Sequence, residues 1–336
     1  MEIQNSDLYK LAKDVLKEYN IEPYGINIIQ SASIKTVWKL KTKSKDLCLK
    51  RLKQSYDKAL FSVNAQEYIS SLGGNVPGII RDKNNNLIVN FNDQLFVVYQ
   101  WLDGRDLEFG NTNSLKEAVK GLSKFHTFSK GYKAPADAKV SSKLGKWPEQ
   151  YESMKNKLLS WKDIAGENPQ TFYNTYLKHV DDMVKIADST LELLNTSSYN
   201  ELTSSDSQSV VLCHQDYGKG NAILTDNGVY VIDLDGVTYE HPARDLRKII
   251  GKLAENRGVW DLSTISNIVD WYSEANHLSE ADKELVYIDM LYPHWFYGLV
   301  KNIFKNNKAE NSSKIEKIAK LEMSKIPLLK SLIKKR

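Results

Sequence analysis

The spacing of hydrophobic residues changes from helical to strand-like early in the chain. Apolar side chains recur at helical spacing over 6–19 and predict an amphipathic helix there. Alternating and short apolar runs then predict strands at 26–30, 35–42, 47–52, 79–81, 87–91 and 94–101. A helix over 56–72, ended by Gly73-Gly74, interrupts the series. The N-terminal part therefore predicts a small, mostly antiparallel sheet with two helices.

The remainder of the chain is mostly helical by the same criterion. Helices are predicted at 114–130, 145–161 and 170–194, and three amphipathic helices are predicted between 261 and 336. The first of them begins with Ser114-Leu115-Lys116-Glu117, a capping box. A connector at 196–209, rich in Ser, Thr, Asn and Asp, predicts a loop. One small sheet together with many helices indicates an α+β fold.

Residues 210–248 interrupt the helical part with a strand and turn pattern. Apolar runs predict strands at 210–212 and 229–234, and a further apolar pair lies between them. Asp226-Asn227-Gly228 is a hairpin turn signal, because Asn-Gly supplies the positive φ angles of tight turns. A helix is predicted to begin at Pro242.

Composition restricts the class of protein. A chain of 336 residues is too long for one small core and suits two lobes. The net charge of +4 is mild and spread along the chain, which does not favour a nucleic-acid partner. No apolar run is long enough to span a membrane, and the first ten residues lack the pattern of a signal peptide, so synthesis in the cytoplasm is expected. Cys48 and Cys213 lie in apolar runs, which favours buried reduced thiols over a disulfide.

Polar residues suited to phosphoryl transfer follow the strands of 210–248. Asn221 lies five residues after Asp216, and Asp233 lies twelve residues after Asn221. One carboxylate can accept the proton of an attacking hydroxyl, while an amide oxygen and a second carboxylate hold Mg²⁺ on the phosphates of ATP. Because strand residues two apart share a face, Asp235 is expected to join Asp233 in the metal region. The alternative is a pair of surface loops with ordinary turn residues.

Lys50 is unusual for its place in a predicted strand. Alternation turns its side chain to the same face as Cys48 and Leu52, which are apolar. A lysine on an apolar face needs a counter-charge or a bound phosphate. The alternative is a surface lysine on an edge strand.

These motifs resemble a known superfamily. CHQDYGKGNAIL (213–224), followed by VIDLDG (231–236) and HPARDLRKI (241–249), resembles the aminoglycoside phosphotransferase and choline kinase superfamily, which has a protein-kinase-like fold. Within it, FHTFSKGY (125–132) and the stretch from Trp38 to Arg51 are similar to the CotS-like spore coat proteins. The resemblance extends over about residues 25–300.

The resemblance implies a two-lobed α+β protein with ATP and Mg²⁺ as cofactors. A small antiparallel-sheet lobe over 1–103 would cover the nucleotide, and a helical lobe over 104–336 would carry the catalytic loop and the acceptor site. The implied activity is phosphoryl transfer from ATP to the hydroxyl of a small molecule, with Asp216 taking the proton and Asn221 and Asp233 holding the metal.

The nucleotide contacts follow from the same resemblance. Lys50 would contact the α- and β-phosphates and pair with Glu67 of the following helix. The adenine would hydrogen-bond to backbone near Gln100, Trp101 and Leu102, where the last strand of the sheet runs into the hinge between the lobes.

The nucleotide-covering loop departs from the pattern of the superfamily. The segment from Gln30 to Lys35 contains no glycine, so close approach of its backbone to phosphates is harder. This departure favours a second function, in which the chain is a weak or inactive kinase-like component of the spore coat and binds other coat proteins. The presence of Lys50, Asp216, Asn221 and Asp233 favours the enzyme.

Four further features have structural and functional interpretations. Asp245 suits the first turn of a helix, and the resemblance implies that it braces the catalytic loop. His126 is expected to be a core histidine rather than a ligand, and Lys219 either reaches the transferred group or is a solvated loop lysine. The lysines over 312–333 predict a solvated helix face. Core packing is favoured over a cage for a quaternary ammonium at the aromatic residues Tyr292, Trp295, Phe296 and Tyr297.

Overall fold

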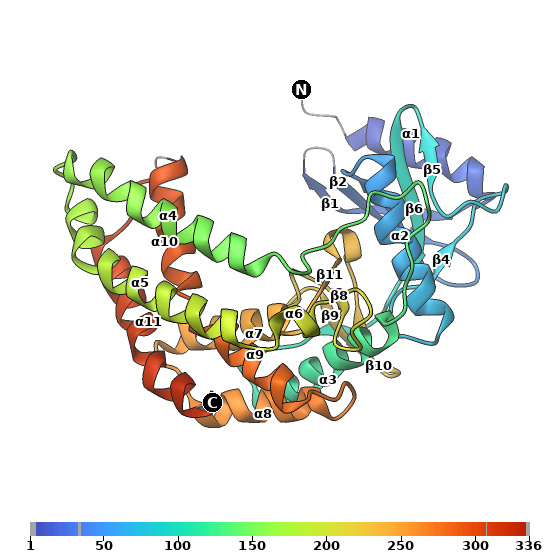
Figure 1. The fold of residues 1–336 in the computed structure, drawn as a ribbon. Coiled ribbons are helices and arrows are strands. Elements are labelled where there is room, and N and C mark those ends of the chain that lie inside the picture. Colours follow the sequence, from blue (N-terminus) through green and yellow to red (C-terminus); the bar gives the residue numbers. More distant parts are fainter. Residues whose placement is uncertain (1–4, 33–34, 307, 334–336) are drawn as a thin grey trace. The chain divides into compact units, whose positions relative to one another are not determined.

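The computed structural model describes residues 5–32, 35–306 and 308–333, which form two compact units (Figure 1). The first unit comprises 1–141 and 216–238, and the second comprises 142–215 and 239–336. The predicted lobe boundary at residue 103 is a different division of the chain and stays a prediction. Residues 33–34 of the glycine-free segment, and the first four residues of the N-terminal segment, lie outside the described residues.

An antiparallel sheet is the centre of the first unit. Its strands are β1 (Gly25–Ala32), β2 (Lys35–Lys41), β3 (Leu47–Leu52), β6 (Gln94–Gln100) and β4 (Ile79–Ile80), in that spatial order, and β5 (Val89–Phe91) also pairs with β6. The pairings are antiparallel. Asn92 and Asp93 connect β5 to β6 with φ angles of 50° and 58°, as a two-residue hairpin turn requires. The predicted α+β fold with an antiparallel N-terminal sheet is confirmed.

Two helices cover this sheet because its strands alternate. Phe96 and Val98 of β6 pack in one apolar cluster with residues of α1 (Asn5–Leu16). Val97 and Tyr99, which point to the other face, pack in a second cluster with residues of α2 (Tyr56–Ser71). The 3₁₀ turn Lys17–Tyr19 extends α1, so the segment predicted as one helix changes type near its end.

The first unit also contains α3 (Thr112–Ser129) and a three-stranded sheet. The strands are β10 (Gly228–Val231), β9 (Ala222–Thr225) and β7 (Arg105–Asp106), in that order. A Cβ at Gly121 of α3 would lie 2.6 Å from Val229, so glycine allows α3 to approach β10 closely. The predicted capping box is wrong: α3 begins earlier, and Asn111 caps it by accepting hydrogen bonds from the backbone N–H groups of Asn113 and Ser114.

Where the structure describes it, the second unit is mostly helical and contains the pair formed by β8 (Val211–Cys213) and β11 (Thr238–Glu240), of which Thr238 belongs to the first unit. Its helices are α4 (Trp147–Gly166), α5 (Thr171–Thr196), α6 (Tyr199–Leu202), α7 (Ala243–Arg257), α8 (Leu262–Ser273), α9 (Glu280–Leu291), α10 (His294–Asn306) and α11 (Ser312–Leu332). In the part of the chain that the structure describes, none of the helices has the length and apolar character that crossing a membrane requires.

Two predictions for this unit need correction. Among the residues described after 261 there are four helices, not three, because Pro293 lies between α9 and α10 and divides the aromatic-rich segment. The short helix α6 lies in the segment predicted as a loop. Tyr292, Phe296 and Tyr297 are buried, which confirms core packing for these aromatic residues.

Candidate active site

Lys50 lies at the centre of a buried charge cluster in the first unit. Its side chain is 9% exposed, and its ammonium group donates to Asp233 Oδ1 at 2.7 Å and to Asp235 Oδ1 at 2.6 Å. The expectation that a lysine on this face of β3 needs a counter-charge is confirmed. Two carboxylates, contributed from a segment far along the chain, supply it.

The local geometry of these carboxylates differs from the predicted one. Strand β10 ends at Val231, and Asp233 has a φ of 63°, in the left-handed region, immediately before a 3₁₀ turn at Leu234–Gly236. The argument from strand alternation was therefore wrong. Instead, a tight turn brings Asp233 and Asp235 to the same ammonium group. A left-handed backbone is uncommon for a residue other than glycine, so surrounding contacts must hold it.

A second lysine contacts the same carboxylate. Lys35, the first residue of β2, donates to Asp233 Oδ1 at 3.1 Å and to Oδ2 at 2.8 Å. Burial would raise the pKa of Asp233, but Lys50 and Lys35 hold that pKa well below its ordinary value. Burial would lower the pKa of Lys50, but Asp235, Tyr99 and Asp233 raise it. The charged forms of Asp233 and Lys50 are therefore both favoured near neutral pH.

The predicted catalytic loop runs from Asp216 to Asn221 in the first unit. Asn221 Nδ2 donates to the backbone carbonyl of Asp216 at 2.9 Å, which fixes the amide orientation. The N–H of Ile232 donates to the Asn221 carbonyl at 3.1 Å, so Asn221 lies beside the segment that leads to Asp233. Asp216 is exposed. Lys219 donates to Glu108 at 2.6 Å, and both side chains are exposed. This agrees with the interpretation of Lys219 as a solvated loop lysine.

A cavity of about 440 Å³ joins several predicted residues. Six of them line it: Lys50, Gln100, Trp101, Leu102, Asn221 and Asp233. Lining residues that the sequence did not indicate as functional include Lys35, Cys48, Gln66 and Tyr99. Asp216, Asp235 and Glu67 do not line this cavity, although Asp235 contacts Lys50. All of these residues belong to the first unit.

The predicted ion pair between Lys50 and Glu67 is wrong. Glu67 pairs with Arg81 at 2.6 Å, whereas Lys50 pairs with the two aspartates. The preceding residue, Gln66, is buried, lines the cavity and donates to the carbonyl of Pro77 at 2.7 Å. Neighbouring helix positions point about 100° apart, so Gln66 faces the cavity and Glu67 does not. The sequence pattern did not show which of the two positions faces the cavity.

In the second unit, α7 braces the two residues that precede Asp216. Asp245, in its first turn, accepts hydrogen bonds from the backbone N–H groups of His214 at 2.6 Å and of Gln215 at 3.0 Å. Lys248 of the same helix donates to the Gln215 carbonyl. Gln215 has a φ of 72°, and these contacts hold that strained conformation. The bracing role predicted for Asp245 is confirmed.

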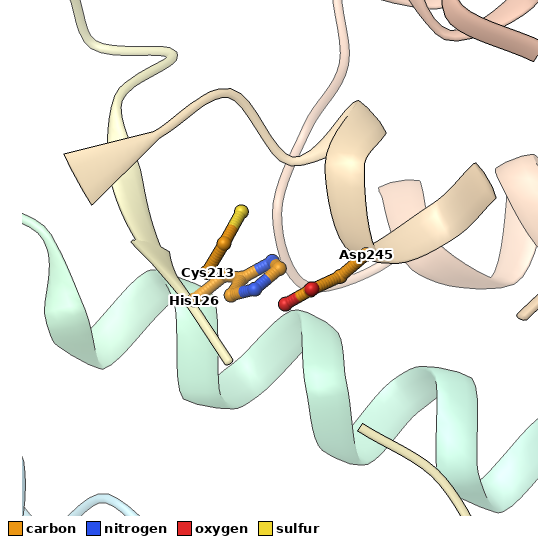
Figure 2. Close-up of side chains that lie close together, drawn as sticks. All are labelled: His126, Cys213 and Asp245. Carbon is orange, nitrogen blue, oxygen red and sulfur yellow. The ribbon is translucent and has the colours of Figure 1, made fainter. Parts of the chain in front are cut away.

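Figure 2 shows Asp245 at the start of α7, Cys213 at the end of β8 and His126 on α3. Cys213 and His126 are buried, as expected for a packed thiol and a core histidine. Burial raises the pKa of the Cys213 thiol well above its ordinary value, so the neutral thiol is favoured. Both cysteines are free, and Cys48 is partly exposed on the cavity.

The fold is shared with phosphotransferases of known structure. An aminoglycoside phosphotransferase from Alicyclobacillus acidocaldarius is similar with a TM-score of 0.78 and 16% identity, over 95% of this chain and 94% of that one. The amicoumacin kinase hAmiN, in complex with AMP-PNP, Ca²⁺ and Ami, is similar with a TM-score of 0.61 and 15% identity, over 96% and 95%. The fold is therefore the kinase-like fold predicted from the aminoglycoside phosphotransferase and choline kinase superfamily.

The family is narrower than the fold. A family model described as "Spore coat putative kinase YutH" matches residues 17–326, and the chain belongs to this family. Spore coat protein S of Bacillus subtilis (strain 168) is 24% identical over 300 residues, which are 89% of this chain and 86% of that protein. The predicted resemblance to the CotS-like spore coat proteins is confirmed.

Proposed function

We propose that this protein binds ATP with a divalent cation in the cavity of the first unit and transfers the γ-phosphoryl group to the hydroxyl of a small molecule. One observation carries the proposal. A buried lysine, a metal-ligand pair and the hinge strand all line one cavity, contributed by Lys50, by Asn221 with Asp233, and by Gln100 to Leu102. These are the parts that kinases use to hold nucleotide and metal.

The lining of the cavity suits a nucleotide. Apolar side chains line it, among them Val37, Tyr99 and Leu102. The N–H groups of Gln100 and Trp101 donate to Gly78 and Asp46, so the next backbone donor along the hinge, at Leu102, suits an adenine. Two ammonium groups, on Lys35 and Lys50, also line the cavity and suit phosphates.

The donor set fits Mg²⁺. Magnesium prefers hard oxygen ligands and keeps several waters, so one or two protein ligands with substrate phosphates suffice. Asp233 offers a carboxylate, and Asn221 has its amide nitrogen engaged with Asp216, which leaves its amide oxygen for the metal. When bound, the cation would neutralise charge on the β- and γ-phosphates. Of the relatives described above, the amicoumacin kinase holds a nucleotide analogue with Ca²⁺.

The transfer step assigns Asp216 to the acceptor. The acceptor oxygen forms a bond to the γ-phosphorus, the bond to the β-phosphate oxygen breaks, and ADP leaves. The carboxylate of Asp216 orients the hydroxyl and takes its proton. Its exposure in the first unit leaves it accessible to an acceptor.

A second function is favoured by the same charge cluster. Lys35 and Lys50 both pair with Asp233, so the chain's own residues balance the charge of this carboxylate. The chain would then serve as a kinase-like component of the spore coat, which the family membership supports. Binding of Mg·ATP separates the two functions.

Calorimetric titration and thermal melting test the proposal. Saturating Mg·ATP should raise the melting temperature of the parent protein, since a ligand of the native state stabilises it. Asp233→Asn should weaken Mg-dependent binding by about tenfold or more, because the bridging cation loses a charged ligand. Asp226→Asn is the matched control. Asp226 lies in the exposed turn between β9 and β10, and the variant should bind Mg·ATP as the parent does.

Asp216 separates binding from transfer. Asp216→Asn should keep Mg·ATP affinity while lowering transfer to an acceptor found by screening, by about a hundredfold or more. No heat and no melting shift with Mg·ATP would contradict the enzyme and support the coat component. Undiminished transfer by Asp216→Asn would contradict the role of this carboxylate.

A further inference from the structure

Lys35 occupies a special place on the sheet. It is the first residue of β2 and pairs in register with Ala32, the last residue of β1. It is therefore the last residue of the glycine-free segment that joins β1 to β2. Its side chain is 23% exposed and lines the cavity together with Lys50 and Asp233.

The contacts of Lys35 are those of a displaceable counter-ion. Its ammonium group lies within hydrogen-bonding distance of both oxygens of Asp233. Lys50 also contacts Asp233, but it keeps a second carboxylate, Asp235. Within the described ranges of the chain, Asp233 is the one acidic partner of Lys35. Loss of the Asp233 contact would therefore leave Lys50 anchored and Lys35 without an acidic partner.

We propose that Lys35 is a phosphate-binding residue, and that its ion pair with Asp233 is a resting contact which the incoming metal and nucleotide replace. The inference rests on the proposed function and deepens it. A divalent cation at Asp233 competes with the ammonium group for the same oxygens. The released ammonium group then lies at the end of the cavity where the phosphates would be, and a phosphate oxygen becomes its partner.

This arrangement compensates for the missing glycines. A glycine-rich loop holds phosphates by backbone N–H groups that approach closely, because no Cβ stands in the way. A long lysine side chain reaches the phosphates from a greater distance, so the backbone need not approach. The sequence from Gln30 to Lys35 lacks glycine but ends in this lysine.

The two parts of the proposal make opposite predictions for Lys35→Gln. Without nucleotide, the variant should bind Mn²⁺ more tightly than the parent, by a few-fold, because one competitor for Asp233 is gone. With nucleotide, it should bind Mg·ADP and Mg·ATP about tenfold more weakly, because a charge-assisted hydrogen bond to phosphate is lost. Electron paramagnetic resonance of free Mn²⁺ measures the first affinity, and calorimetry measures the second.

Lys41→Gln is the matched control. Lys41 lies on the same strand six residues along, on the same face, and is exposed. Its replacement removes one positive charge of the sheet without touching Asp233, and both affinities should equal those of the parent. Unchanged thermal melting without ligand checks that each variant is folded.

The outcomes are distinguishable. Opposite changes in the two affinities support the proposal. If Lys35→Gln binds Mg·ATP as the parent does, Lys35 is no phosphate ligand and the inference fails while the proposed function stands. If both affinities fall together, Lys35 only supports the turn at Asp233, and the inference also fails. If the parent binds no nucleotide, the proposed function and this inference fail together.

Discussion

Two buried lysines, one in each unit, show how the same residue type serves different ends. Lys50 of the first unit lines a cavity and has two carboxylate partners, each about one-third exposed. Lys325 of the second unit has a side chain that is 0% exposed, as has its partner Glu322. It also donates to the carbonyl of Tyr292 at 2.9 Å. Lys325 is enclosed by protein on all sides, whereas Lys50 is buried but lines a cavity.

The surroundings act in opposite directions on the two ammonium groups. Burial lowers the pKa of Lys325, and Glu322 opposes that effect only in part. At Lys50, two aspartates and Tyr99 outweigh burial, and the pKa rises. The two carboxylates are partly exposed beside a cavity, so a metal ion can replace the lysine as their partner, and phosphates can replace the carboxylates as partners of the lysine. An enclosed pair has no such exchange, so its role is structural.

The neighbours of Lys325 show what that structural role is. Glu322 accepts hydrogen bonds from the backbone N–H groups of Trp295 and Phe296, at the start of α10. The Lys325 ammonium lies 5.4 Å from the ring centre of Trp260 and 6.0 Å from that of Trp295. The pair therefore ties α11 to the turn between α9 and α10.

The largest expected effect sharpens this comparison. Lys325→Met should lower the free energy of unfolding by about 3–5 kcal/mol, because it leaves the charge of Glu322 buried without its partner. Mg·ATP affinity should not change. Lys50→Met should do the reverse: its aspartates are about one-third exposed and Asp233 keeps Lys35, so stability falls less than in Lys325→Met, while nucleotide affinity falls by about tenfold or more. Denaturant unfolding and calorimetry measure the two effects.

Lys330→Met is the control for the enclosed lysine. Lys330 lies on the same helix and is exposed, so its loss should change the free energy of unfolding by less than about 0.5 kcal/mol. If Lys325→Met were as stable as this control, the buried pair would contribute nothing, and the contrast with Lys50 would lose its basis.

Asp245 gives the next largest effect. Its carboxylate is buried and accepts two backbone N–H groups beside the strained Gln215. Asp245→Ala leaves both donors without this acceptor and should cost about 1–3 kcal/mol of the free energy of unfolding. Asp245→Asn keeps one acceptor oxygen and should cost less. Urea unfolding of the two variants measures the order, and equal stability of Asp245→Ala and the parent would contradict the bracing role.

The sequence predicted those parts of the fold that depend on a short local pattern of residues. Strand alternation placed β2 and β3 to within a residue, and the Asp226-Asn227-Gly228 signal marked the hairpin turn between β9 and β10. The spacing from Asp216 to Asn221 and Asp233 predicted a phosphoryl-transfer motif, and two of these residues, Asn221 and Asp233, line one cavity; their roles stay a prediction. These signals are local, so the sequence carries them directly.

The rest depended on tertiary contacts. The periodicity of α11 assigned its lysines to solvent, and nothing in that pattern distinguishes Lys325, which is buried because Glu322 caps another helix. Lys35 carried no signal either, because its partner lies 198 positions away. Asp233 was assigned to a strand, but it has a left-handed backbone at a turn and is paired with lysines from β2 and β3, which strand periodicity does not encode.

The smallest effect concerns Glu240, a carboxyl group for which the described residues of the chain provide no ion pair. Glu240 is buried and accepts from the indole N–H of Trp147 at 3.1 Å and from the backbone N–H of His241 at 2.9 Å. Burial raises the pKa of Glu240 from 4.5 to about 7. The folded protein therefore holds this proton more tightly than the unfolded chain does. Between these two values the contribution of Glu240 to stability falls as pH rises.

A second buried group has the opposite sign in the same window. Burial lowers the pKa of His294 from 6.5 to about 3, so its contribution to stability rises with pH up to about 6.5. In the parent protein the two contributions partly cancel. Glu240→Gln removes one of them, and the free energy of unfolding of the variant should rise more steeply between about pH 5 and pH 7 than that of the parent. The difference between the two curves should change by on the order of 1 kcal/mol, measured by denaturant unfolding at a series of pH values. Parallel curves for the parent and Glu240→Gln would show that Glu240 is ionised in the folded protein with a partner, like the aspartates of Lys50. The comparison between enclosed charges and charges beside a cavity would then not extend to Glu240.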